Sequence, residues 1–194
     1  RGDGAAAVVI GTREGSVVCL AGESGEREWV AAGDWGTVLS PALADLDGDH
    51  RVEVLVGAEK VSLICLDSTG RELWRRSEGA GGSPFVWRAE PATGARIFCG
   101  MGRRLHALDA QGRTCWSHPM NRELDSAIAV ADTDADGQPE VYAVDLSGHV
   151  VSLTWDGRLR WEAEVGERSR RSPARSCTTV PRCRRASGAS RHRS

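Results

Sequence analysis

The sequence predicts an all-β fold, a partial β-propeller of about four blades, each a four-stranded antiparallel sheet. Four segments of similar pattern end in a tryptophan, at Trp29, Trp74, Trp116 and Trp161, with spacings of 45, 42 and 45 residues. Short apolar runs and glycine-containing turns alternate within each segment. A repeat of roughly 44 residues built from short strands is typical of one propeller blade. No stretch of about twelve residues has the apolar period of a helix.

Each segment opens with a short strand of the buried type. The opening strands are VVIG (8–11), VLVG (54–57) and IFCG (97–100), all apolar and all ending in glycine. The turns that follow contain Asp, Ser and Gly, which favour positive φ or bond their own backbone. The last three segments share the spacing L-x-x-x-G-x-x-x-W, and the first has one extra residue between Leu20 and Gly25.

Two of the predicted inter-strand loops have acidic side chains at alternate positions. They are DLDGDHRVE (45–53) and DTDADGQPE (132–140). Calcium takes six to eight oxygen ligands, and a curled loop can turn alternate carboxylates toward one point. The predicted ligands are Asp45, Asp47, Asp49, Glu53 and the Arg51 carbonyl in the first loop, and Asp132, Asp134, Asp136, Glu140 and the Gln138 carbonyl in the second.

The spacing argues against an EF-hand, which needs a bidentate acid at position 12 and a following helix. Position 12 is Val56 or Ala143, inside a predicted strand. The first loop also has His50 at position 6, where the second has Gly137, so the first site is expected to be weakened rather than lost. The alternative interpretation of both loops is a solvated acidic turn. The segment RAEPATGAR (88–96) lacks the acids and is predicted to bind no metal.

Residues 2 to about 165 resemble two related families of propeller repeats. The D-x-D-x-D-x-x-x-E loops and their flanking strands resemble the FG-GAP/VCBS repeat of integrin alpha subunits and secreted bacterial proteins. The segments CLDSTGRELW and ALDAQGRTCW resemble the tryptophan-docking repeat of pyrroloquinoline-quinone-type propellers. This second resemblance implies that Trp74, Trp116 and Trp161, and also Trp29, dock between adjacent blades.

The charge distribution separates the propeller body, residues 1–166, from a tail at 167–194. Nine arginines and no acid follow Glu167, which leaves 16 basic against 27 acidic residues in residues 1–167, a net charge of about −11. The tail is rich in Arg, Ser and Pro and is predicted to be disordered. One interpretation of the tail is a basic arm that binds nucleic acid or an acidic surface. The other is the product of a shifted reading frame. The sequence favours the shifted frame, because the fourth segment breaks off just after its tryptophan.

Catalytic and redox motifs are weak in this sequence. The histidines are scattered, and His106 and His149 are predicted to be packed or surface residues in or beside strands. Cys19 and Cys65 occupy equivalent places in neighbouring blades, too far apart for a disulfide. Cys99 and Cys115 are predicted to be small core residues. Whether the chain is part of an enzyme stays open, with a binding protein favoured.

We therefore expect a calcium-stabilised, non-catalytic binding or scaffold module, a fragment of a ring of about seven or eight blades. The alternative is part of an enzymatic propeller, quinoprotein dehydrogenase-like or polysaccharide lyase-like, whose active site lies outside the fragment. The expected ligand is a protein or a carbohydrate, with no nucleic acid bound by the acidic body and no membrane span. Calcium sites of this kind suit an extracellular, periplasmic or cell-surface setting, although no signal peptide is visible in the fragment.

Overall fold

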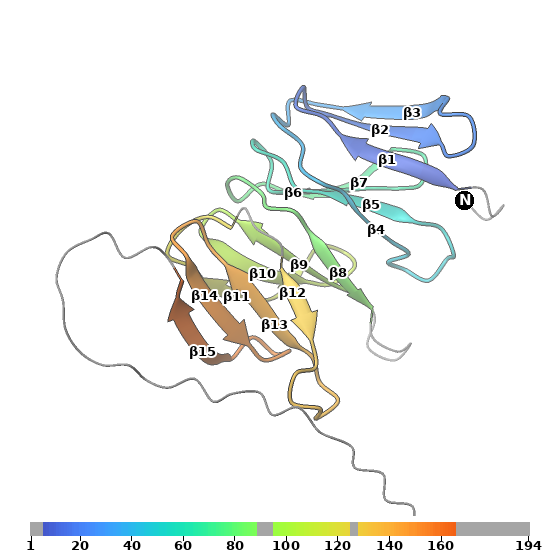
Figure 1. Ribbon diagram of the computed structural model, residues 1–194. Coiled ribbons are helices and arrows are strands. Elements are labelled where there is room, and N and C mark those ends of the chain that lie inside the picture. The colour runs from blue at the N-terminus through green and yellow to red at the C-terminus, as the bar shows by residue number, and fades with distance from the viewer. Residues whose placement is uncertain (1–5, 89–94, 125–127, 166–194) are drawn as a thin grey trace, which may run out of the picture.

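A computed structural model describes residues 6–88, 95–124 and 128–165 of the 194-residue chain. All regular structure in these ranges is β-strand, arranged as four antiparallel sheets that follow one another along the chain (Figure 1). The all-β propeller prediction is confirmed. The 167–194 tail lies outside the described residues. The described part has no helix of a length and hydropathy that would cross a membrane.

We call the four sheets blades 1 to 4. Blade 1 has β1 (Ala7–Gly11), β2 (Ser16–Ala21) and β3 (Arg27–Ala32). Blade 2 has β4 (Ala42–Ala44), β5 (Glu53–Val56), β6 (Leu63–Leu66) and β7 (Glu72–Arg76). Blade 3 has β8 (Phe85–Arg88), β9 (Ala95–Met101), β10 (Arg104–Leu108) and β11 (Thr114–Pro119). Blade 4 has β12 (Ala129–Ala131), β13 (Glu140–Val144), β14 (His149–Leu153) and β15 (Leu159–Glu164).

Each strand pairs with its neighbour in sequence, so every blade is an antiparallel meander. The four-stranded prediction holds for blades 2, 3 and 4, whereas blade 1 has three strands within the described residues. Equivalent strands therefore place equivalent loops on the same side of successive blades. This repetition positions the acidic loops considered below.

The hydrophobic core is divided among the spaces between blades. Side chains alternate across a strand, so Val54 and Val56 of β5 pack against blade 1 while Leu55 between them packs against blade 3. All three are buried, which explains why this strand is apolar at each of positions 54–56. Each such side chain contributes roughly 1.5–3 kcal/mol by its burial. A third cluster, which includes Phe98 and Val141, joins blades 3 and 4.

Tryptophans dock each blade onto the next, as the repeat predicts. The indole N–H of each donates a hydrogen bond to a backbone carbonyl of the following blade. The pairs are Trp29 to Ser68 (3.1 Å), Trp74 to Ala110 (3.2 Å) and Trp116 to Trp155 (2.9 Å). In every case the acceptor lies two residues before the turn glycine.

The turn glycine is required at each dock for two reasons. Gly70, Gly112 and Gly157 have φ of 84°, 74° and 85°, a region that favours glycine. A Cβ on these residues would lie 2.5, 2.8 and 2.6 Å from ring atoms of Trp29, Trp74 and Trp116, respectively. In the spacing L-x-x-x-G-x-x-x-W, the glycine therefore receives the tryptophan of the preceding blade, and the tryptophan docks on the glycine of the following blade.

The cysteine predictions are partly wrong. Cys19, Cys65 and Cys99 are buried and Cys115 is exposed, and none of the four is in a disulfide. The pairing of β10 with β11 shifts at this point, since Ala107 pairs with Trp116 and Leu108 with Thr114, so Cys115 is the extra residue of a β-bulge in the outer strand. The core assignment of Cys115 is thus corrected.

We predict that Gly112→Ala lowers the free energy of unfolding by about 2–4 kcal/mol, from left-handed strain plus overpacking against Trp74. The matched control is Gly48→Ala, where φ is 86° and a Cβ meets no atom within 4 Å. It should lose only about 1–2 kcal/mol. Urea unfolding in the presence of a calcium chelator measures both, and equal losses would contradict the docking role.

Candidate metal centres

The two acidic loops occupy the same place in blades 2 and 4. Loop 1 (45–53) joins β4 to β5, and loop 2 (132–140) joins β12 to β13. The residues at the base of each loop are partners in the strand register, Ala44 with Glu53 and Ala131 with Glu140. The hairpin therefore closes each loop and holds its last glutamate in a regular strand.

The first aspartate organises each loop by accepting hydrogen bonds from the backbone N–H groups at positions 4 and 6. The acceptors and donors are Asp45 with Gly48 (2.6 Å) and His50 (3.3 Å), and Asp132 with Ala135 (2.7 Å) and Gly137 (3.0 Å). The loops have one geometry built from different residues. Such aspartate-centred turns form without a metal, so they define the shape of the loop but not its ligand.

Positions 4 and 6 are left-handed in both loops. The φ values are 86° at Gly48 and 66° at His50 in loop 1, and 62° at Ala135 and 87° at Gly137 in loop 2. Each loop thus has one glycine and one strained non-glycine residue, in opposite order. His50 adopts the positive φ expected of position 6, and Ala135 carries the equivalent strain in loop 2.

Carboxylates converge in both loops, although the converging residues differ from the predicted sets. Oxygen atoms of Asp45, Asp47 and Glu53 lie within 4.8 Å of one another, as do those of Asp132, Asp134 and Asp136. Asp49 and Glu140 do not belong to these groups. Asp49 accepts a hydrogen bond from the N–H of Arg51 (2.7 Å). Ligation by the carbonyls of Arg51 and Gln138 stays a prediction.

The environment of the last glutamate distinguishes the loops. Glu53 is buried and accepts a bond from the N–H of Leu46 (2.7 Å). Burial raises the pKa of this carboxyl, and the repulsion of the neighbouring aspartates adds to the rise. In loop 2 the hydroxyl and N–H of Thr133 lower the pKa of Glu140, with help from Arg160. In loop 1 an arginine, Arg88 of β8, pairs with Asp45, and no ion pair reaches the buried Glu53 within the described residues.

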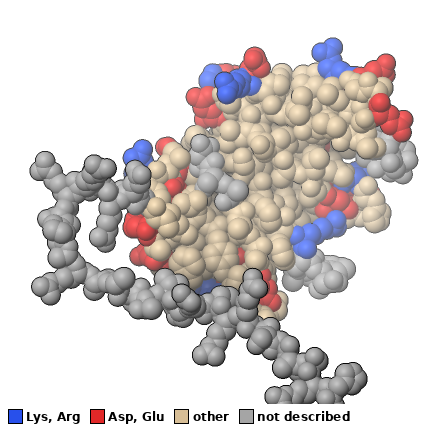
Figure 2. Space-filling view, viewed as in Figure 1, with Lys and Arg blue, Asp and Glu red and all other residues tan. Residues whose placement is uncertain are grey.

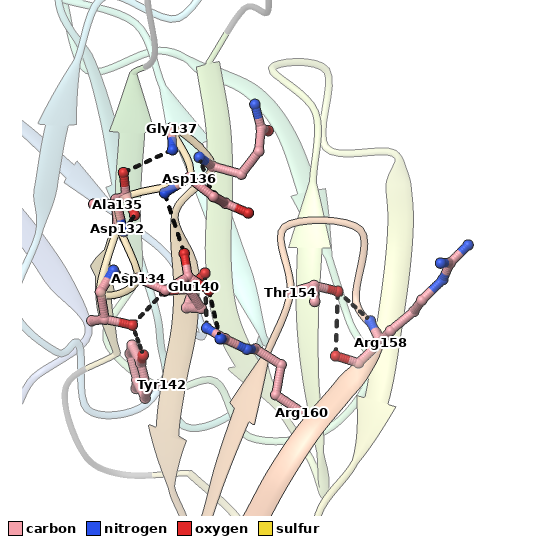
Figure 3. Close-up of polar contacts among 12 residues, drawn as sticks. Asp132, Asp134, Ala135, Asp136, Gly137, Glu140, Tyr142, Thr154, Arg158 and Arg160 are labelled. Carbon is pink, nitrogen blue, oxygen red and sulfur yellow. Dashed lines mark hydrogen bonds and ion pairs between the residues drawn. The ribbon is translucent and has the colours of Figure 1, made fainter.

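Arg160 of β15 is the functional residue that the sequence analysis missed. Its guanidinium pairs with Asp134 (Nη2 to Oδ2, 2.7 Å) and with Glu140 (Nη1 to Oε1, 2.9 Å), as Figure 3 shows. The residue before the docking tryptophan is Arg160 in blade 4 and Leu73 in blade 2. Aligning the segments on their tryptophans would have revealed this difference. Loop 2 thus has an arginine that bridges two of its carboxylates, whereas in loop 1 Arg88 of β8 pairs with Asp45 alone (Nη1 to Oδ2, 3.4 Å).

Loop 1 lies beside the dock of its own blade. A cavity of about 150 Å³ is lined by Asp47 and Glu53 of the loop, by Leu73 and Trp74 of β7, and by Gln111 of blade 3. An ion that orders loop 1 would therefore also order one wall of the junction between blades 2 and 3.

A histidine is buried in that same junction. His106 of β10 is 4% exposed and neither ring nitrogen has a hydrogen-bond partner within the described residues. The Glu78 carboxylate lies 3.8 Å from its Nε2. Burial lowers the pKa of His106, and Glu78 only partly opposes this. His106 and His149 both lie buried in strands, as predicted for packed residues.

Comparison with known families gives one match, to the PQQ_2 model, described as outer membrane protein assembly factor BamB, over residues 13–188. This match supports the predicted resemblance to tryptophan-docking, pyrroloquinoline-quinone-type repeats. The resemblance to FG-GAP/VCBS repeats stays a prediction. A comparison with curated proteins found no match.

Three solved structures show the same fold. BamB from Moraxella catarrhalis has 23% identity and a TM-score of 0.66, over 82% of this chain and 47% of that one. The quinohemoprotein alcohol dehydrogenase ADHIIG from Pseudomonas putida HK5 has 14% identity and a TM-score of 0.61, over 82% and 33%. The computationally designed Ika8 protein has 17% identity and a TM-score of 0.56, over 79% and 44%. The chain thus spans less than half the length of each.

The pKa of His106 predicts that stability falls with acidification. Because the folded pKa lies below the ordinary value of 6.5, the unfolded chain binds this proton more readily. The stability that the neutral His106 contributes is present above pH 6.5 and is lost as the pH falls toward its pKa in the folded protein. Lowering the pH from 7.5 to 5.5 should cost on the order of 1 kcal/mol at this site.

His106→Val, which introduces the residue found at the equivalent Val18 and Val151, should flatten this pH dependence. Urea unfolding at the two pH values, on the variant and the parent, measures the difference. Parallel losses in the two proteins would contradict the assignment.

Proposed function

Because the chain belongs to the PQQ_2 family, described as outer membrane protein assembly factor BamB, we propose that it is a non-catalytic propeller module that binds other proteins during outer-membrane assembly. The family match over residues 13–188 is the observation that supports this most. The repeated tryptophan docks and the cores between blades have a structural role, which leaves the surface and the loops available for binding.

The distribution of charge supports a protein partner. In Figure 2 the charged side chains gather at the rims of the described part, and uncharged residues form the broad surface between them. The cores of protein–protein interfaces are depleted in charged residues. A protein is therefore the favoured ligand and a carbohydrate the alternative. The proposed setting is periplasmic or cell-surface, in keeping with the family description.

We further propose that loops 1 and 2 bind calcium, which would cancel the repulsion among their carboxylates. Hard carboxylate oxygens are the ligands that calcium prefers, and each loop brings three of them together. Loop 1 should bind more tightly, because no arginine pairs with the buried Glu53 within the described residues, and its one ion pair, Arg88 with Asp45 (3.4 Å), is longer than the two of Arg160 in loop 2 (2.7 and 2.9 Å). In loop 2 calcium must compete with Arg160 for Asp134.

A quinoprotein-like enzyme is the second candidate, favoured by the structural likeness to a quinohemoprotein alcohol dehydrogenase. That likeness is at 14% identity and concerns the fold. Fold alone does not imply activity, because propellers of one architecture serve unrelated functions. The scaffold proposal rests on a match of sequence as well as of fold, and is preferred for that reason.

Binding to an unfolded outer-membrane β-barrel protein tests the proposed function. The labelled barrel protein is diluted from urea into the full chain, and fluorescence anisotropy is recorded. We expect saturable binding with a Kd of about 1–10 μM, and none with a folded soluble protein of similar size. Pyrroloquinoline quinone with an alcohol and an electron-acceptor dye tests the second candidate. Quinone-dependent dye reduction, or equal binding to both proteins, would overturn the scaffold proposal.

Calorimetric titration with calcium chloride tests the loops. The parent should show two sites of unequal affinity, with a calcium-dependent rise in Tm. Asp47→Ala should remove the tighter site and Asp134→Ala the weaker one, since each loses one of three converging carboxylates. Absence of heat and of a thermal shift in a folded sample would mean that the loops are solvated acidic turns.

Arg160→Leu supplies the residue of blade 2 and removes the competing cation. We expect the loop 2 affinity for calcium to rise about three- to tenfold with the loop 1 affinity unchanged, because a two-pronged ion pair of about 1 kcal/mol no longer opposes binding. A lower affinity at loop 2 would show that Arg160 organises the site rather than competing for it.

A further inference from the structure

The junction of blades 3 and 4 has polar side chains at one end, whereas its centre is apolar. His118 of β11 pairs in register with Leu105 of β10. His149 lies two residues before Val151 on β14. Leu105 and Val151 both belong to the core cluster that joins the two blades. Because opposite residues of a pair share a face, as do alternate residues of a strand, His118 and His149 face this junction from its two sides.

Two glutamates of β15 face the same junction. Glu162 pairs in register with Val151, and Glu164 pairs with His149. Beside them is a hollow of about 410 Å³, which is lined by His149, Glu162, Glu164, Asn121 and Ala163. The imidazole of His149 thus forms part of the wall of a space that can hold an ion and its water ligands.

Both ring nitrogens of His149 are directed to carboxylates. Nε2 lies 3.1 Å from Oε2 of Glu162, and Nδ1 lies 3.9 Å from Oδ2 of Asp145. The second contact is electrostatic, since it is too long for a hydrogen bond. The side chains of His149 and Asp145 are 9% and 0% exposed. A metal-binding histidine commonly has its other ring nitrogen facing a carboxylate, which orients the ring and raises its basicity.

The Asp145 carboxylate behind the imidazole is fixed by hydrogen bonds. Ser147 donates from its hydroxyl (2.6 Å) and from its N–H (2.8 Å). The N–H groups of Arg122 (2.8 Å) and His149 (3.2 Å) also donate to it. Donors of this kind favour the charged form of a carboxylate. A buried negative charge therefore stands on the far side of the ring from the hollow.

The separation of His149 from Glu162 suits zinc. Zinc binds imidazole nitrogen and carboxylate oxygen at about 2.0–2.2 Å in a tetrahedral arrangement, which places two ligand atoms about 3.3 Å apart. The observed distance from Nε2 to Oε2 is 3.1 Å. An ion can therefore replace the hydrogen bond between these two side chains with little movement of either.

His118 and Glu164 are placed to complete the ligand set. Burial lowers the pKa of His118, Glu162 opposes this and His149 adds to it, so the three groups lie within electrostatic reach. Glu164 is exposed and directly opposite His149. Within the described residues, three ligand atoms already converge only in loops 1 and 2. Binding at this junction thus requires the side chains of His118 and Glu164 to rotate toward the ion.

We propose that His118, His149, Glu162 and Glu164 bind one zinc ion, which links blade 3 to blade 4. Imidazole ligands favour zinc over calcium, which takes oxygen ligands. His118 lies two residues after Trp116, so the ion reinforces the dock between these blades. The site is independent of the calcium proposed for loops 1 and 2.

Calorimetric titration of the full chain with zinc chloride tests the site. The Asp47→Ala/Asp134→Ala double variant serves as the background, because it weakens the two acidic loops as competing sites. We expect one zinc ion per chain with a Kd below about 10 μM and a zinc-dependent rise in Tm. Weaker binding would mean that His149 and Glu162 form only an ordinary hydrogen bond, and would overturn the proposal.

Glu162→Gln in this background locates the ion. The variant should fold, because Glu162 is exposed and glutamine can still bond His149. We expect at least tenfold weaker zinc binding, whereas Glu23→Gln, a change of an exposed glutamate in blade 1, should have no effect. Equal affinities in these two variants would place the ion elsewhere in the chain. His118→Gln tests the link between blades and should also lose at least tenfold. An unchanged affinity there would contradict the bridging of the two blades.

Discussion

The rest of the molecule depends on the contact between an indole ring and a turn glycine of the next blade. A blade is too thin to bury its own apolar side chains, so its stability comes from the sheets on either side. The Trp74–Gly112 contact fixes both the distance and the register between two sheets, because the ring needs a backbone without Cβ beneath it. The indole N–H removes the remaining freedom by bonding one specific carbonyl. Once blades are held in this way, equivalent loops fall in equivalent places.

Loops 1 and 2 share one backbone shape but differ in the charged residues that surround their carboxylates. Both loops curl around the first aspartate and both bring carboxylates together. In loop 2 the charge is met by Arg160 from the outer strand, whereas in loop 1 Leu73 stands at that place and the buried Glu53 keeps a raised pKa. The shape follows from hydrogen bonds within the loop, whereas the balance of charge depends on arginines of other strands, Arg160 in loop 2 and Arg88 in loop 1.

The repeat spacing predicts much of the fold because it records contacts within a blade and between successive blades. Trp29, Trp74 and Trp116 were correctly placed for that reason. Arg160 escaped prediction because its partners lie across the blade: aligning the repeats shows that it replaces Leu73, but the spacing within one repeat does not show what it contacts. Cys115 was misassigned because it is the extra residue of a β-bulge before the docking tryptophan, and the apolar pattern of the sequence does not reveal a bulge. Which blade covers a given face depends on the arrangement of all the sheets. The sequence of a single strand does not reveal it.

The division of the core into separate inter-blade clusters has a consequence for how the molecule unfolds. Contacts reach only the adjacent sheets, so the free energy is close to a sum over neighbouring pairs, as in a one-dimensional lattice. Terminal blades have one such pair and internal blades have two. A blade with one neighbour is therefore expected to open more readily than a blade with two. Loss of structure would then spread from blade to blade, and each broken dock would leave the next blade with one neighbour fewer.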